Sequence, residues 1–451
     1  MRLSYYKYSL KHGVQKIKTR TAIMLSVIGL ALGGGAGMSL LAFSSAHAAT
    51  PGWQLNPSAI VFTCGGAPYG HHLNTVSENQ STGDFTGTGS YNADSSYTWN
   101  ATGNVSDSNI TFQIVYTGTN AGYTLNGVGT IASDGSVSGT VDGNCESFTM
   151  PAGSATHYCL PTGFVRDGID LTARQIGGDV TGTLDATGCN IGVYYNSAHT
   201  GNVTGATVFG ANYFGVVNDG TSVDVTNSTV RNIGEVPFNG TQHGVGVYYT
   251  NGATGTISGN TVNLYQKGGI VANGDGTVVT VSHNTVTGLG PKDFIAQNGI
   301  QVSRGATGSV NLNTVSDNEY TGANFASSGG ILVFGGCGTP VSAHVEIGNN
   351  TVTNNDVGIY AVNYNDDCDG PTNVWTRVNV HNNVISKDSD TNVSGWDGSI
   401  GYQAGIDDVG KGDNIHNNKI SGAGYTQQTN PVVYPIDTTM TSKEKVHNNT
   451  F

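Results

Sequence analysis

Five aspartates stand close together in two phrases of the C-terminal half of the sequence, and their side chains are the groups best suited to chemistry. The phrase NDDCDG (365–370) supplies Asp366, Asp367 and Asp369, and GIDDV (405–409) supplies Asp407 and Asp408. Paired carboxylates can act as general acid, base or nucleophile on a glycosidic bond. We therefore treat Asp367, Asp369, Asp407 and Asp408 as catalytic candidates, and Asp366, Asp367 and Asp369 as oxygen ligands suited to Ca²⁺.

An apolar and aromatic strip is predicted beside these acids. In each phrase containing Gly-Ile, the isoleucine is expected to point inward, so that the next residue points outward. This places Leu332, Tyr360 and Asp407 on one outer face, with Phe334 two residues beyond Leu332. Aromatic rings and carboxylates together suit a sugar, so Phe334, Tyr360 and Asp366 are the predicted ligand-binding residues. The alternative is that a loop or the N-terminal region covers this strip, and that the acids are solvated turn residues.

Three histidines share a register in successive phrases that begin HNN. His381, His416 and His447 are expected to form one column if the coils stack without an offset. A zinc site needs ligands that converge at about 2 Å, which a linear column does not supply. We therefore expect outward-facing corner residues here, and no metal.

The elements that must position these residues follow from a repeat. Phrases such as SGNTV (258–262), GNNTV (348–352) and HNNVI (381–385) recur at unequal intervals, and a second phrase, as in GGILV (329–333), alternates with them. Each is a short β-branched run bounded by Gly and Asn, which predicts short strands between turns. Constant phrases with variable spacing predict a solenoid whose loops vary in length. Asparagine tolerates the left-handed corner conformation, and stacked asparagines can hydrogen-bond to one another as a ladder.

The repeat carries a resemblance. With their xNNxI and GI phrases, residues 158–451 resemble the right-handed parallel β-helix domains of the pectate-lyase-like superfold. The resemblance implies the architecture rather than an activity, because this superfold includes polysaccharide lyases, glycoside hydrolases, tailspikes, adhesins and proteins without known catalysis. The DDC triplet echoes the polygalacturonases, but their NTD and RIK elements are missing and QHG (242–244) precedes DDC instead of following it. That likeness therefore does not imply polygalacturonase activity.

Residues 49–157 have a different sequence pattern from the repeat. Alternating apolar and polar runs are separated by the turn sequences NAD (92–94), SDSN (106–109), TNAG (119–122) and SDG (133–135). Such hairpin turns predict an antiparallel meander that closes as a small barrel or a sandwich. The expected fold class is therefore all-β, with a right-handed parallel β-helix solenoid preceded by a small antiparallel domain.

Six cysteines predict disulfide bonds in an exported chain. Cys64 and Cys145 bracket the antiparallel domain, which suggests one bridge that closes a long loop. A Cys159–Cys189 bridge would tie the cap region of the β-helix. Cys337 and Cys368 fall in corresponding loops of adjacent coils, which predicts a third bridge between them.

The N-terminal residues predict where the protein is located, and its net charge limits the partners that it can bind. Residues 1–48 hold six of the 18 Lys and Arg and no acid, followed by an apolar run and the small-residue site AHA (46–48), which predicts a cleaved signal peptide. A retained membrane anchor is the alternative. Without this leader, 12 basic residues face 31 acidic ones, a net charge near −19, which argues against nucleic acid and anionic membranes as partners.

These observations together predict a secreted or cell-surface protein that needs no cofactor and does not insert into a membrane after signal cleavage. Its expected partner is an extracellular polysaccharide or a cell-surface glycan, bound as a carbohydrate-binding protein or an adhesin binds it. The alternative is a polysaccharide-active enzyme, a glycoside hydrolase or a lyase, that uses acids on the outer face of the β-helix.

Overall fold

The computed structural model describes residues 52–80, 82–322, 326–389, 402–427, 433–439 and 441–451. The predicted signal peptide, residues 1–48, lies outside these ranges. Within them the chain is almost entirely β, and the one helix is the short α1 (Ala423–Thr426). None of the described residues belongs to a helix long and apolar enough to cross a membrane.

The N-terminal part is a closed antiparallel barrel, which decides between the barrel and the sandwich that the sequence allowed. Its strands are β2 (Ser58–Cys64), β3 (Ala67–Glu78), β4 (Asp84–Tyr91), β5 (Thr98–Ser106), β6 (Asn109–Tyr116), β7 (Thr124–Ile131), β8 (Val137–Val141) and β9 (Ser147–Met150). The barrel closes because β9 pairs back with β2. Side chains alternate between solvent and interior along β7, and Phe62, Trp99 and Phe148 fill the core.

A two-stranded ribbon is formed by the segments that precede and follow the barrel in the chain. It consists of β1 (Trp53–Leu55) and β10 (Ala155–His157), which pair antiparallel. Trp53 stacks on His157 with ring centroids 3.8 Å apart, and His157 Nε2 lies 3.3 Å from a carboxylate oxygen of Asp185 in the first coil of the solenoid. The ribbon therefore contacts the β-helix through a side-chain pair as well as through the chain.

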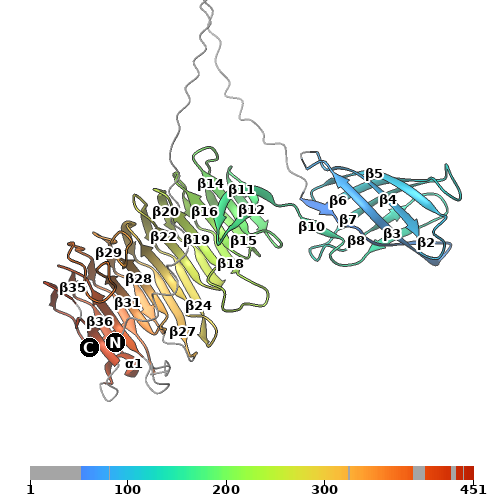
Figure 1. Ribbon diagram of the computed structural model, residues 1–451. Coiled ribbons are helices and arrows are strands. Elements are labelled where there is room, and N and C mark those ends of the chain that lie inside the picture. The colour runs from blue at the N-terminus through green and yellow to red at the C-terminus, as the bar shows by residue number, and fades with distance from the viewer. Residues whose placement is uncertain (1–51, 81, 323–325, 390–401, 428–432, 440) are drawn as a thin grey trace, which may run out of the picture.

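The remainder is a parallel β-helix, in which each coil contributes strands to two sheets (Figure 1). The eleven-stranded sheet comprises β11 (Leu160–Arg166), β12 (Ile169–Ile176), β14 (Ile191–Asn196), β16 (Phe214–Asp219), β19 (Val245–Thr250), β22 (Gly268–Asn273), β25 (Asn298–Ser303), β28 (Gly329–Gly335), β31 (Val357–Asn363), β34 (Gln403–Val409) and β37 (Val433–Asp437). Within it only the β11–β12 hairpin is antiparallel. The predicted fold class is thus confirmed.

The seventeen-stranded sheet bends around a corner, so that most coils give it two short strands. They are β13 (Val180–Asp185), β15 (Val203–Phe209), β17 (Val225–Thr226), β18 (Thr229–Ile233), β20 (Thr254–Ser258), β21 (Thr261–Tyr265), β23 (Val278–Ser282), β24 (Thr285–Lys292), β26 (Thr307–Asn311), β27 (Thr314–Tyr320), β29 (Glu346–Gly348), β30 (Thr351–Thr353), β32 (Asn379–His381), β33 (Val384–Ser386), β35 (Asn414–His416), β36 (Lys419–Ser421) and β38 (Lys445–His447). All of its pairings are parallel. The strands therefore stay parallel despite the variable loops, with local register shifts between Val180 and Gly182 and between Thr287 and Gly290.

The interior of the β-helix is built from side chains that repeat in register. Ile300 pairs with Ile331, Ile331 with Ile359, and Ile359 with Ile406, and all four are fully buried. The inward assignment of the isoleucines in the Gly-Ile phrases is confirmed. The coils stack because each adds one more layer to this apolar column.

Buried asparagines form a ladder along the corner between the paired strands, as the sequence predicted. Asn313 Nδ2 donates to Asn350 Oδ1, and Asn350 Nδ2 donates to Asn383 Oδ1, both at 3.0 Å. The complete series is Asn260, Asn284, Asn313, Asn350, Asn383, Asn418 and Asn449. The residue before each ladder asparagine turns the corner in the left-handed region, for example Asn349 with φ 56°.

Three disulfide bonds join the six cysteines as Cys64–Cys145, Cys159–Cys189 and Cys337–Cys368. The first closes the barrel strands β2 and β9 near their ends, and the second ties the segment after β10 to the first coil. The third links the loops that follow β28 and β31. The predicted Cys337–Cys368 bridge is therefore confirmed.

Proteolysis of the unreduced protein should release three pairs of linked peptides, because the structure leaves no cysteine free. Mass spectrometry before and after reduction should assign these pairs to the three bridges above. A free thiol at Cys337 or Cys368, or a bond from either to a barrel cysteine, would contradict this connectivity.

Candidate functional site

One outward column of residues runs along the eleven-stranded sheet from β14 to β37, with one residue from each of these nine strands. Its members, in register, are Tyr194, Val217, Tyr248, Val271, Gln301, Leu332, Tyr360, Asp407 and Asp437. Parallel stacking keeps a side chain on the same side from coil to coil, so this column defines the outer face. The predicted alignment of Leu332, Tyr360 and Asp407 is confirmed.

The N-terminal part of the outer face is covered. Phe164 and Leu171 of the β11–β12 hairpin belong to a buried cluster with Phe214 and Tyr248. Arg166 of the same hairpin donates through Nη1 to the Tyr248 hydroxyl at 3.4 Å and lies 5.4 Å from the centre of that ring. Tyr248 is only 4% exposed. This part of the face is therefore a packing surface.

Beyond the hairpin the same column mixes rings with carboxylates and is unevenly exposed, since Val271 and Asp437 are buried at 6% and 5%. Leu332, Tyr360 and Asp407 are each of intermediate exposure. The Tyr402 hydroxyl donates to Asp437 Oδ2 at 3.1 Å, next in register after Asp407. Burial, together with the negative charge of Asp407, raises the pKa of both Tyr360 and Tyr402 well above the ordinary value. Both phenols therefore stay neutral and can donate hydrogen bonds.

Phe334, also predicted to bind ligand, lies at the edge of this face. It is half-buried, and its ring centroid lies 6.4 Å from that of Tyr364, which follows β31. Phe334 is in register with Val362, two residues beyond Tyr360. The aromatic surface therefore extends along the strands as well as across them.

The loop acids Asp366, Asp367 and Asp369 are exposed and follow the end of β31. Their loop is held by the Cys337–Cys368 bond and by the side chain of Asn365, whose Nδ2 donates to Asp369 Oδ1 at 2.8 Å. Since β31 ends three residues past Tyr360, its last residue lies about 10 Å along the strand. The loop acids lie beyond that point, so the carboxylate that stacks next to Asp407 is Asp437.

Asp408 requires a correction. It was a candidate among the outer-face acids, but it points into the β-helix and is fully buried beside Asp413. Alternation along β34 sends Asp407 outward and Asp408 inward. Asp413 Oδ1 accepts from the Thr376 hydroxyl at 2.6 Å and from the Val378 amide at 2.8 Å. Burial and the nearby Asp413 carboxyl raise the pKa of Asp408 well above its usual range, which favours its protonated form.

No sequence pattern indicated that the pair of Lys387 and Glu319 would be buried. Lys387 Nζ lies 2.6 Å from Glu319 Oε2, and both side chains are almost fully buried. Asp356 Oδ2 accepts from the backbone amides of Tyr320 and Ser328, each at 2.8 Å. Burial raises the pKa of Asp356 to about 7. These bonds fix the segment around Ser328 next to Tyr360 and Tyr402.

The three histidines do form the predicted column. The rings of His381 and His416 stack at 5.4 Å, and those of His416 and His447 at 5.1 Å. His381 Nε2 pairs with Glu346, and partial burial beside two other imidazoles lowers the pKa of His416. Among the described residues, no group of three or more His, Cys, Asp or Glu is arranged to hold a metal ion. Ca²⁺ binding by Asp366, Asp367 and Asp369 stays a prediction.

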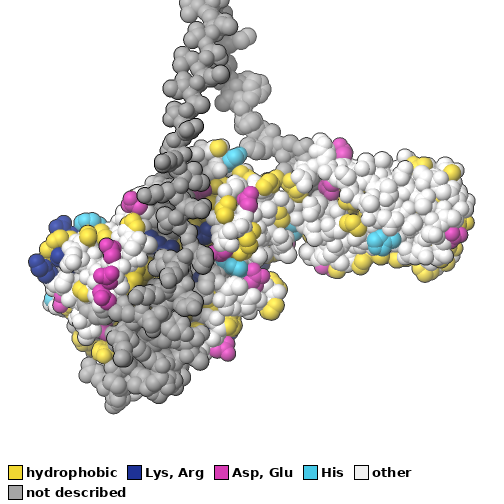
Figure 2. Space-filling model, in the orientation of Figure 1, with side chains coloured by type: hydrophobic (Ala, Val, Ile, Leu, Met, Phe, Trp, Pro, Cys, Tyr) yellow, Lys and Arg dark blue, Asp and Glu magenta, His cyan; other side chains and the backbone are white. Residues whose placement is uncertain are grey.

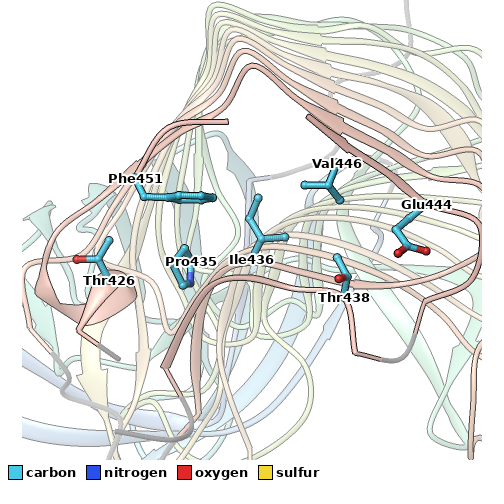
Figure 3. A pocket seen from close by; sticks show the side chains of 7 residues that line it. All are labelled: Thr426, Pro435, Ile436, Thr438, Glu444, Val446 and Phe451. Carbon is cyan, nitrogen blue, oxygen red and sulfur yellow. The ribbon is translucent and has the colours of Figure 1, made fainter. Parts of the chain in front are cut away.

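A pocket of about 630 Å³ opens at the last coil (Figure 3). Its lining is Thr426, Pro435, Ile436, Thr438, Glu444, Val446 and Phe451. Ile436 continues the inward column of Ile406, and Val446 continues that of Ile415. The pocket is thus an extension of the β-helix interior and is separate from the outer face.

Sequence reasoning missed Asp437 and Tyr402. Asp437 follows an isoleucine in YPID (434–437), as Asp407 does in GIDD, and this shared Ile-Asp pair was the available signal. Tyr402 has no counterpart in the repeat phrases, so periodicity did not indicate it. Neither protein-family models nor curated proteins produce a match to this chain.

Proposed function

We propose that this chain is an extracellular protein that binds a polysaccharide, free or at a cell surface, along the outer face of β28, β31, β34 and β37. The observation that carries the proposal is the half-buried column of Leu332, Tyr360 and Asp407, beyond the part of the face that the β11–β12 hairpin covers. Rings stack on the apolar faces of pyranoses while carboxylates and neutral phenols bind hydroxyls.

Other features support an extracellular setting and a carbohydrate partner. Three disulfides suit an oxidising compartment. The strongly acidic composition disfavours nucleic acid. We assign the solenoid to the pectate-lyase-like superfold as part of the same proposal, supported by its long parallel sheets. The same surface would serve an adhesin that recognises a cell-surface glycan.

The variant Tyr360→Ala should weaken polysaccharide binding by about 1 kcal/mol, because it removes one stacking ring. The measurement is retention of the purified protein on a panel of neutral and acidic polysaccharides, with thermal unfolding in parallel. Tyr69→Ala, which removes a 41% exposed tyrosine from the barrel, is the matched control and should bind as the wild type does. A large loss of stability in Tyr360→Ala without loss of retention would identify a packing surface instead.

A polysaccharide hydrolase is the second candidate, favoured by one specific observation. Asp407 and Asp437 occupy the same register on neighbouring parallel strands, which places their backbones about 4.8 Å apart. The two carboxyl groups of retaining glycosidases are separated by about 5 Å. In this case the wild type should release product from the polysaccharide, and Asp407→Asn should abolish that release while the protein is still retained on the polysaccharide. That result would identify the chain as a hydrolase and not as a binding protein.

A further inference from the structure

An exposed tryptophan lies on a corner of the β-helix, away from the outer face. Trp375 belongs to the segment between β31 and β32 and is 44% exposed, next to Val374, which is 56% exposed. Its indole lies against Gly412 of the following coil. A Cβ built at Gly412 would lie 2.2 Å from two ring carbons, so this position accommodates the indole only as glycine. One face of the ring therefore packs against the neighbouring coil.

Three cationic side chains surround this ring. The centre of the indole lies 5.6 Å from the Arg377 guanidinium, 5.6 Å from Lys411 Nζ and 5.3 Å from Lys443 Nζ. Because Asn379, Asn414 and Lys445 are in register, Arg377, Gly412 and Lys443 occupy one corner position in three successive coils. We name Trp375, Arg377, Lys411 and Lys443 the basic-aromatic patch.

The patch concentrates positive charge in an acidic protein whose net charge is −13. Of the four salt bridges among the described residues, none involves Arg377, Lys411 or Lys443. Lys411 Nζ donates to the Asn373 carbonyl at 2.7 Å, which holds it beside the ring. Figure 2 shows Lys and Arg side chains gathered at the end of the molecule where Figure 1 labels β35.

The backbone conformation at two residues of the basic-aromatic patch is unfavourable in free energy. Arg377 and Lys443 both adopt the left-handed region, with φ 50° and 59°, which non-glycine residues rarely enter. Like charges held around one ring also repel one another. The left-handed backbone and the repulsion between like charges both cost free energy, and no carboxylate among the described residues pairs with these cations. This combination is suited to binding an external anion.

We propose that the basic-aromatic patch binds an anionic saccharide, one sugar ring stacking on Trp375 while its carboxylate, sulfate or phosphate pairs with Arg377 and Lys443. The aromatic ring provides the contact for an apolar sugar face, and the guanidinium provides paired donors for an oxyanion. The site is distinct from the Tyr360 face, so it does not depend on the function proposed above. Single-stranded nucleic acid would use the same chemistry, but the acidic remainder of the molecule repels a long polyphosphate.

Affinity electrophoresis of the purified protein tests this site, with gels that contain a neutral glucan, a polyuronate, a sulfated glycan or a phosphorylated glycan. We expect retardation by at least one charged polymer, and weaker retardation as salt screens the contact. Trp375→Ala and Arg377→Gln/Lys443→Gln should each weaken it by about tenfold. The control pair Arg231→Gln/Lys292→Gln removes the same charge from β18 and β24, and should bind as the wild type does. Thermal unfolding of each variant confirms that it is folded.

Several results would overturn the proposal. They are the absence of retardation by all three charged polymers, an equal loss in the control pair, and patch-dependent binding of single-stranded DNA but of no charged glycan. The proposal would also be overturned if Tyr360→Ala removed the retardation by an acidic polymer and Trp375→Ala left it unchanged. That result would show that the outer face, and not the basic-aromatic patch, binds the polymer. The conservative Trp375→Phe keeps a stacking ring and should retain most of the binding. If Trp375→Ala and Trp375→Phe lose binding equally, stacking is not the contact.

Discussion

Asn350→Ala should lower the free energy of unfolding by about 4 kcal/mol, because it leaves several buried polar groups without partners. The Asn350 side chain accepts from the backbone and side-chain amides of Asn313, at 2.9 and 3.0 Å. Its Nδ2 also donates to the Val310 carbonyl at 2.8 Å. All of these atoms lie inside the corner of the β-helix, where water does not replace the lost bonds. Urea unfolding followed by circular dichroism measures the effect.

The neighbouring residue supplies the control. Asn349 is exposed and left-handed with φ 56°, a conformation that glycine adopts without strain. Asn349→Gly should therefore change the unfolding midpoint by far less than Asn350→Ala does. Equal destabilisation by the two variants would show that the corner is stabilised by its conformation and not by the ladder.

Asp408→Asn should stabilise the protein at pH 8 and flatten the dependence of its stability on pH. The folded-state pKa values of Asp408 and Asp413 are raised above the unfolded value of 3.8, so the folded state binds more protons. Stability is then highest at low pH and falls as pH rises through the folded pKa, by about 1.4 kcal/mol for each pH unit and each bound proton. The asparagine cannot ionise, so the cost of its burial does not change with pH.

The measurement is the urea midpoint of wild type and variant between pH 5 and pH 8. Some slope below pH 7 should persist in the variant, because burial raises the pKa of Asp356 to about 7 and this acts in the same direction. Asp367→Asn, on an exposed loop, is the control and should keep the wild-type profile. If Asp408→Asn keeps that profile as well, the buried pair does not control the pH dependence.

The coil architecture was predictable because parallel stacking converts a sequence repeat directly into contacts. The isoleucine of each Gly-Ile phrase had to face the core, and the residue after it had to face outward, so Leu332, Tyr360 and Asp407 could be placed in one column. The asparagine ladder followed for the same reason. Closure of the N-terminal strands as a barrel did not follow, since it depends on the pairing of β2 with β9, which are far apart in sequence.

Features outside the repeat could not be predicted in this way. Trp375 lies in a loop, and its place over Gly412 and between Arg377 and Lys443 depends on how three coils pack rather than on any period. Asp408 is different, because the alternation rule applied to Ile406 already sends it inward. Its assignment to the outer-face acids overlooked that rule, and its burial beside Asp413 supplies the pH dependence instead.

The asparagine ladder also gives the β-helix a dipole along its axis. In every rung the amide nitrogen donates toward the following coil and the amide oxygen faces the preceding one, from Asn260 to Asn449. Strand dipoles largely cancel in a sheet, whereas these aligned side-chain dipoles add along the axis, as peptide dipoles do in a helix. Their positive end points toward the C-terminal coils, which also carry Arg377, Lys411 and Lys443. An anion near that end therefore experiences a field to which each asparagine of the ladder adds.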